Sequence, residues 1–251
     1  MIEVLFALSV FVCLAGASLG VLMFYGRLPA HHREDDTQNV VRLIANIFVV
    51  MTSLVLGLMI NSAKARYDGI NRDAHSFAID LILLDRLLLL YGSDADETRR
   101  GLLAYMERAA NGKWTSGDSV LVSDKTSEDL LNEVGRGIRA LKPADDPRLA
   151  VWNDARAQFQ KVVERRWGLV EQAEGSIPIP LLGLVVAWLI LIFGSFGLRA
   201  PRNALVVLSF VSASALMAGA IYLIVDMDAP FDGTIQISPA PLQRALAEIR
   251  R

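Results

Sequence analysis

The sequence predicts an all-α membrane protein in which four transmembrane helices form two pairs on either side of a soluble, mostly helical insert. Hydrophobic residues make up 53% of the chain, yet 21% of its residues are charged, and these two populations occupy different stretches of the sequence. Bilayer hydrocarbon is about 30 Å thick, so a spanning helix needs roughly 20 apolar residues. Four stretches reach that length without a charged side chain.

The four predicted spans are residues 4–26, 43–63, 175–198 and 203–225. The first run is too long for the apolar segment of a typical signal peptide, and acidic Glu3 stands where a basic segment is expected. We therefore predict that it is retained as a span. A soluble protein reaches this hydrophobicity only over shorter helices, so the bilayer is the expected surrounding of all four.

This order divides the chain into a first transmembrane hairpin (1–63), a soluble helical domain (64–174), a second transmembrane hairpin (175–225) and a C-terminal tail (226–251). An even number of spans places both termini on the same side of the membrane. Lys and Arg are modestly more frequent at the span ends that adjoin the soluble domain, which favours a cytoplasmic location for that domain and for both termini.

The soluble domain is predicted to begin as a helix that continues directly out of the second span. Over residues 73–92, apolar side chains recur at spacings of three and four. Because this run also contains Asp80, Asp85 and Arg86, we predict a buried helix of a soluble layer and not a fifth span.

Later turns and helices of the insert follow from capping and breaking residues. Gly92 and Ser93 end the first helix, and Ser93 or Asp94 can cap the next. Residues 111–119 are predicted to be loop, a further helix opens at Ser127 towards Leu141, and the last covers about 147–168. Pro178 and Pro180 fit the first turn of the third span, where missing backbone donors cost least.

No catalytic pattern is present in the sequence: it has no HExxH, GxSxG, Walker A or dinucleotide-binding glycine motif. A polar loop carries side chains of metal-binding type, namely His31, His32, Glu34, Asp35 and Asp36. Adjacent histidines on a loop point in different directions, so a solvated turn is favoured over a metal site. We predict no enzyme activity and no cofactor.

Two further absences exclude other classes of protein. The only cysteine, Cys13, lies inside the first span, which excludes intramolecular disulfides and a cysteine-based metal site. A net charge of -2 without a basic patch and interleaved aromatic residues predicts no nucleic-acid partner.

The second span is the most informative segment because polar residues recur along one side of it. At 100° per residue, an arc of about 100° holds five residues of the span and the arginine just before it, namely Arg42, Asn46, Val50, Ser53, Gly57 and Asn61. Polar groups in hydrocarbon are costly unless they face another helix or water. Helix–helix packing and a pore lining, with Arg42 and Asn61 at its two mouths, both explain this arc. Periodicity alone favours packing.

Two motifs resemble the bestrophin family. The run SLVLGLMINSAKARYD, residues 53–68, resembles the second membrane helix of bestrophins, and DMDAPFDGTIQIS, residues 226–238, resembles the segment after their last membrane helix. The whole chain is similar to the bacterial bestrophin-like family, long catalogued as an uncharacterised domain. Its members share an LxxHHR-type hairpin, an LGLMxNSAKxxYD run and a DxDxPFxG tail.

The resemblance implies a homopentameric channel of a bacterial inner membrane that passes small inorganic ions passively, with anions preferred. Val50, Leu54 and Leu58 would be the apolar neck positions, and hydrophobic constrictions of this kind can gate by dewetting. A row at every fourth residue drifts by about 40° per step, so the three face one axis only on an inclined helix. This row competes with the polar arc for the side of the helix that faces the axis.

The acidic segment after the last span has two explanations. Asp226, Asp228 and Asp232 are weak calcium candidates, because three carboxylates are few for an ion that takes six to eight oxygen ligands. The favoured alternative is a tight turn that docks the tail onto the soluble helices. Its residues would be Pro230, Phe231, Asp232 and Gly233.

A second hypothesis belongs to a different class: a non-conducting membrane scaffold or regulatory protein whose soluble helices bind partners. The polar arc of the second span would then be a packing seam. The four spans contain no carboxylate, so nothing in them suggests the proton relay of an active transporter.

Overall fold

The computed structural model describes residues 2–24, 35–112, 125–172, 177–198, 200–229, 231 and 234–250. Over these residues all regular structure is helical, which confirms the predicted fold class. The chain divides into two compact units. We call Met1–Arg66 with Ser176–Asp228 the membrane unit, and Tyr67–Gly175 with Ala229–Arg251 the soluble unit.

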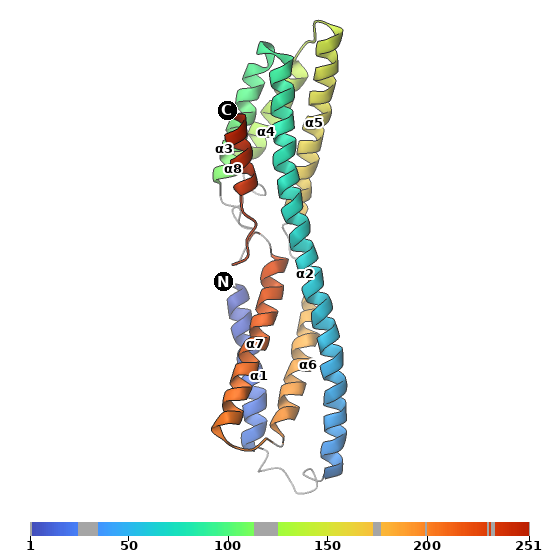
Figure 1. Cartoon of the computed structure of the whole chain (residues 1–251), viewed down its shortest axis with the longest axis vertical. Helices are drawn as coiled ribbons and strands as arrows, with labels where there is room; N and C mark the ends of the chain where they lie inside the picture. Colours follow the sequence, from blue (N-terminus) through green and yellow to red (C-terminus); the bar gives the residue numbers. More distant parts are fainter. Residues whose placement is uncertain are drawn as a thin grey trace. The chain divides into compact units, whose positions relative to one another are not determined.

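Four helices of the described chain are long and apolar enough to cross a membrane, as the sequence predicted. They are α1 (Ile2–Phe24), α2 (Asp35–Tyr91), α6 (Ile179–Gly197) and α7 (Ala204–Asp228) (Figure 1). With 57 residues, α2 is far longer than a span requires, and only its first part belongs to the membrane unit. The protein is therefore an integral membrane protein.

The membrane unit is held together chiefly by α1, which packs against both α6 and α7. Leu14, Val185 and Ile221 are almost fully buried in this core. Gly197 allows the closest approach, because a Cβ at this position would lie 2.5 Å from the carbonyl oxygen of Ser18. Small residues at such crossings let helix backbones come together in lipid.

The soluble unit combines the end of α2 with four further α-helices. These are α3 (Asp96–Asn111), α4 (Lys125–Ala140), α5 (Asp146–Glu171) and α8 (Ala240–Ile249). Phe77, Leu84 and Leu88 of α2 are buried in its core with Leu102 and Met106 of α3. The predicted continuation of the second span into this unit is confirmed, since α2 has no break before Tyr91.

Two predicted helix starts need correction. Ser93 and Asp94 do not cap the next helix: Ser93–Ala95 forms a 3-10 turn, η3, and α3 begins without a side-chain cap. Gly92 has a positive φ of 106°, which turns the chain, and its carbonyl accepts the Ala95 N–H, so a cap is not needed there. Ser127 lies buried inside the first turn of α4 and does not open it.

Other predicted starts agree with the structure. Asp145 caps α5 by accepting the backbone N–H of Arg148 at 2.8 Å, and Pro178 precedes α6 with Pro180 in its first turn. The predicted loop 111–119 lies largely outside the described residues, and its first residue, Asn111, ends α3.

Candidate functional site

The predicted neck residues form an exposed row on the membrane part of α2. The exposed fractions are 69% for Val50, 66% for Leu54 and 61% for Leu58. Because the row lies on one uninterrupted helix, its spacing and direction are fixed by the helix geometry. Within one copy of the chain these side chains are therefore not part of the core.

The residues of α2 that do pack into the membrane unit lie on the other side of the helix. Ala45, Thr52, Met59 and Ala63 are each at most 6% exposed. At 100° per residue, this buried side is centred about 160° from the row of neck residues. The neck row thus faces almost directly away from α1, α6 and α7 of the same chain.

The predicted polar arc is exposed as well. Arg42, Asn46, Ser53, Gly57 and Asn61 all lie open on the surface of α2. Ser53 satisfies its hydroxyl within the helix, by donating to the Val49 carbonyl at 2.8 Å. Within the described part of the chain, the side chains of Asn46 and Asn61 have no hydrogen-bond partner. Packing against other helices of the same chain therefore does not account for the arc.

Arg42 and Asn46 also line a cavity of about 340 Å³ between α2 and the end of α6. Asn39, Ser195 and Phe196 complete much of its wall. No carboxylate among the described residues pairs with Arg42. The cavity thus presents one guanidinium and two carboxamide groups at the end of the predicted span, where such groups can interact with an ion or with water.

A polar junction joins three helices at the other end of the membrane unit, and sequence reasoning missed it. Asp228, which ends α7, accepts the backbone N–H of Ile177 at 2.9 Å, just before α6. Its other oxygen lies 3.8 Å from Nε of Arg66 on α2. The sequence offered one signal for this junction. Arg66 and Asp228 carry opposite charges, and each lies just after the C-terminal end of an apolar run.

The weak calcium candidates do not form a visible cluster. Asp226 is fully buried and Asp228 is 7% exposed, and Asp228 is engaged as described above. Asp232 lies outside the described residues. In the described ranges, no three His, Cys, Asp or Glu side chains are placed to hold a metal ion together.

Of the predicted docking turn, only Phe231 is described, because Pro230, Asp232 and Gly233 lie outside the described residues. Phe231 is 2% exposed and belongs to the core of the soluble unit. Farther along, the Tyr67 hydroxyl donates to the Gln236 carbonyl at 3.4 Å, and Leu242 of α8 is fully buried. These contacts fix the tail on the helices of the soluble unit.

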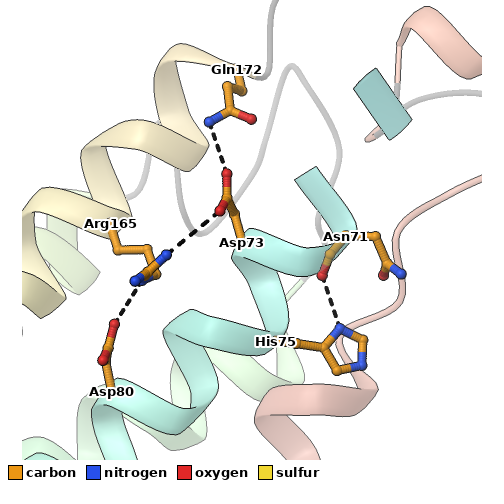
Figure 2. A network of polar contacts seen from close by, with 6 residues as sticks. All are labelled: Asn71, Asp73, His75, Asp80, Arg165 and Gln172. Carbon is orange, nitrogen blue, oxygen red and sulfur yellow. Dashed lines mark hydrogen bonds and ion pairs between the residues drawn. The ribbon is translucent and has the colours of Figure 1, made fainter. Parts of the chain in front are cut away.

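Ion pairs explain how α2 can carry the buried carboxylate of Asp80 next to the partly exposed carboxylate of Asp73 in the soluble unit. Figure 2 shows Arg165 of α5 between two carboxylates of α2: its Nε lies 2.7 Å from Asp80, and Nη1 lies 3.6 Å from Asp73. Gln158 donates to the other oxygen of Asp80 at 3.1 Å, and Gln172 does the same for Asp73. The residues of each pair lie far apart in the sequence, so the sequence alone could not predict that they pair.

The histidine-rich loop gives no site to assess. His31, His32 and Glu34 lie outside the described residues, and the side chains of Asp35 and Asp36 are likewise not described. His75 lies on the exposed side of α2, where its Nδ1 is 2.9 Å from the Asn71 carbonyl (Figure 2).

The four spans and the all-helical fold are features that the resemblance to bestrophins predicts. No curated protein matches the chain. The family model described as the Bestrophin-like domain matches residues 12–242, which is most of the chain, and the protein therefore belongs to the bestrophin-like family.

Proposed function

We propose that the protein is an oligomeric channel that passes small inorganic ions passively along the exposed face of α2. One observation carries the proposal: Val50, Leu54 and Leu58 are among the most exposed residues of α2 and point away from the rest of their own chain. Copies arranged around a common axis would turn this row inward and form a narrow apolar neck. Family membership supports a pentamer.

The polar arc is a reason to expect that copies of the chain associate, because a single subunit would expose these polar side chains to lipid. A carboxamide or guanidinium in hydrocarbon costs several kcal/mol (about 2–7 for an amide) unless it finds a partner. Asn46 and Asn61 find none in their own chain within the described residues. The polar arc is centred about 75° around the helix from the neck row. If the neck row faces the pore axis, the polar side chains of the arc can contact a neighbouring copy or the water at the mouths of the pore.

Anions are the favoured ions of this channel. Arg42 supplies a positive charge at one end of the span without a described carboxylate to neutralise it. We propose a bacterial inner membrane as the location of the channel. The modest excess of Lys and Arg at the span ends next to the soluble unit favours a cytoplasmic location for that unit and for both termini.

Planar-bilayer recording of the purified protein tests the proposal. Discrete ohmic current steps are expected, with a reversal potential that shifts with the chloride gradient. A reversal potential that follows the cation gradient would overturn the anion preference alone. Complete absence of current steps at all potentials, from protein that is oligomeric in detergent, would overturn the channel. A monomer in detergent would leave no axis for a pore and would argue equally against it.

For the acidic segment we propose a structural role in preference to calcium binding. Asp228 is already used to hold Ile177 and Arg66, and buried Phe231 anchors the tail. Asp228→Asn should therefore lower the thermal stability, whereas adding calcium or a chelator should change neither stability nor current. A calcium-dependent rise in stability that Asp228→Asn abolishes would favour the metal site.

A non-conducting scaffold remains the second candidate, and an exposed apolar row on the soluble unit favours it. Ile79, Leu83 and Leu90 of α2 are 56%, 47% and 70% exposed. Apolar groups exposed together on a soluble surface mark protein–protein contacts. A stable oligomer or partner complex without any ion current would select this function.

A further inference from the structure

The cavity of about 340 Å³ between α2 and the end of α6 lies at the depth of the lipid headgroups. Arg42, in its wall, directly precedes the second apolar run, and α6 ends at Gly197, next to Leu198 of the same wall. Both spans therefore leave the hydrocarbon at this cavity. The polar layer of the bilayer, about 5–7 Å thick on each side, begins there and contains the phosphate groups of the lipids.

The cavity lies on a different side of α2 from the neck row. Five residues of α2 contribute to its wall, namely Asn39, Val41, Arg42, Ala45 and Asn46. At 100° per residue, these five are centred about 130° around the helix from the neck row. If the neck row faces the pore axis, a group bound in the cavity stands beside the ion path of the proposed channel and not in it.

The polar groups in the wall suit an anion. Arg42 has several N–H donors and a permanent positive charge, and no carboxylate among the described residues pairs with it. Asn39 and Asn46 add carboxamide N–H groups, and the described part of the chain provides neither with a hydrogen-bond partner. Ser195 adds no donor, because its hydroxyl donates to the Ile192 carbonyl at 2.7 Å. The side-chain donors that the described wall offers to a ligand therefore belong to α2.

We propose that this cavity binds the phosphate group of an anionic phospholipid, with Arg42, Asn39 and Asn46 as its donors. A guanidinium holds phosphate oxygens through paired, charge-assisted hydrogen bonds. Phe196 and Leu198 in the same wall are apolar and can contact the glycerol and the first carbons of the acyl chains. The phosphate thereby neutralises Arg42 at the edge of the hydrocarbon, where an unpaired charge is costly.

Occupation of the site would weaken the anion preference of the proposed channel, because a bound phosphate offsets the charge of Arg42. This consequence alone rests on the proposed function. Binding is measured without any current, so a protein that binds the lipid but gives no current steps contradicts the channel and not the site.

The end of α6 offers an alternative partner for Arg42. The last carbonyl groups of a helix lack helical donors and attract cations. Arg202 shows how an arginine of this unit uses a helix end: its Nε and Nη2 donate to the Leu22 and Met23 carbonyls of α1 at 3.2 and 2.8 Å. Among the described residues, Arg42 makes no such bond to α6. Stability that is independent of the lipid would identify this alternative.

The test measures thermal unfolding of the full chain in detergent micelles while phosphatidylglycerol replaces phosphatidylcholine at constant total lipid. The midpoint should rise and saturate, by about 3 °C or more once phosphatidylglycerol exceeds its dissociation constant about tenfold. Arg42→Gln should abolish this rise. Asn39→Ala, which removes one donor, should raise the half-saturating fraction of phosphatidylglycerol about fivefold.

A second addition separates a lipid from a free anion. Inorganic phosphate, added to the protein in phosphatidylcholine micelles at constant ionic strength, should not reproduce the rise, because it makes no use of the apolar wall. An equal rise with inorganic phosphate would identify a site for free anions and overturn the assignment to a lipid.

Arg202→Gln is the matched control, since it removes another arginine of the membrane unit. It should lower the midpoint, because the end of α1 loses its donors, but it should keep the rise with phosphatidylglycerol. Loss of the rise in this variant as well would show a general effect of surface charge and would overturn the proposal.

A wild-type midpoint that is the same in both lipids overturns the proposal. So does a full rise with phosphatidylglycerol in Arg42→Gln. If Arg42→Gln gives no folded protein, Asn39→Ala decides, and an unchanged half-saturating fraction in that variant overturns the proposal.

Discussion

The carboxylate of Asp85 on α2 accepts a hydrogen bond from Nε of Arg99 on α3 at 2.7 Å. Asp85 is fully buried, and the same guanidinium lies 3.4 Å from the Ile249 carbonyl at the end of α8. The hydrogen bond to Asp85 raises the pKa of Arg99 above its ordinary value, so the Arg99 guanidinium stays charged throughout the neutral range. It joins three helices of the soluble unit.

Asp85→Asn should lower the free energy of unfolding by about 3 kcal/mol, because it keeps the shape of the side chain but leaves Arg99 without its counter-charge. Denaturant unfolding of the purified chain measures this. Asp94→Asn is the matched control: Asp94 pairs with Arg148 at 3.1 Å, but both side chains are well exposed. Loss of such a surface pair should change the stability by about 0.5 kcal/mol or less. Equal effects of the two substitutions would contradict the role given to burial.

Leu54→Ala and Leu58→Ala should each give larger or leakier currents, because a shorter side chain widens an apolar neck and makes it easier to wet. The oligomer should persist in both variants. Single-channel conductance and native electrophoresis measure the two properties.

Leu216 of α7 provides the control for the neck, since it is 77% exposed and lies on a span that we assign to the scaffold. Leu216→Ala should leave the conductance unchanged. If Leu54→Ala instead abolishes the oligomer and lowers the yield without raising the conductance, the row is a packing seam and not a neck.

The sequence was sufficient to predict the membrane architecture because span length and the segregation of charge are local properties. The continuation of α2 to Tyr91 was also predictable. Apolar residues keep the helical spacing of three and four beyond the span, where charged residues appear in the sequence. Pairings such as Asp80 with Arg165, 85 positions apart, depend on how helices pack and could not be predicted.

The candidate site was predictable only in part for the same reason. Periodicity identified the residues that share a side of α2, but it could not say which side the other helices cover. That depends on the burial of Thr52, Met59 and Ala63, which only tertiary structure reveals. The burial of Arg166 could not be predicted at all, because the adjacent Arg165 has the same charge and yet pairs with two carboxylates.

Gly197→Ala should destabilise the membrane unit, because the added Cβ would lie 2.5 Å from the Ser18 carbonyl oxygen and 3.1 Å from the Val21 Cβ. Overpacking of this kind typically costs about 1–3 kcal/mol. Gly183→Ala on the same helix is the control, since no atom lies within 4 Å of its added Cβ. That substitution should be neutral or slightly stabilising, because alanine favours the helix. Thermal unfolding in detergent compares them, and a neutral Gly197→Ala would show that α1 and α6 pack less tightly than described.

Tyr105→Phe should reduce the sensitivity of the soluble unit to alkaline pH. Burial raises the pKa of this phenol in the folded protein, whereas the unfolded tyrosine ionises near its ordinary value of 10.0. The contribution of Tyr105 to stability is therefore complete below that pH and falls as the pH rises towards the folded pKa, by up to about 1.4 kcal/mol per pH unit. Denaturant unfolding at about pH 9 and about pH 11 should show a smaller loss for the variant than for the wild type. Equal losses would mean that the Tyr105 hydroxyl reaches solvent in the folded protein.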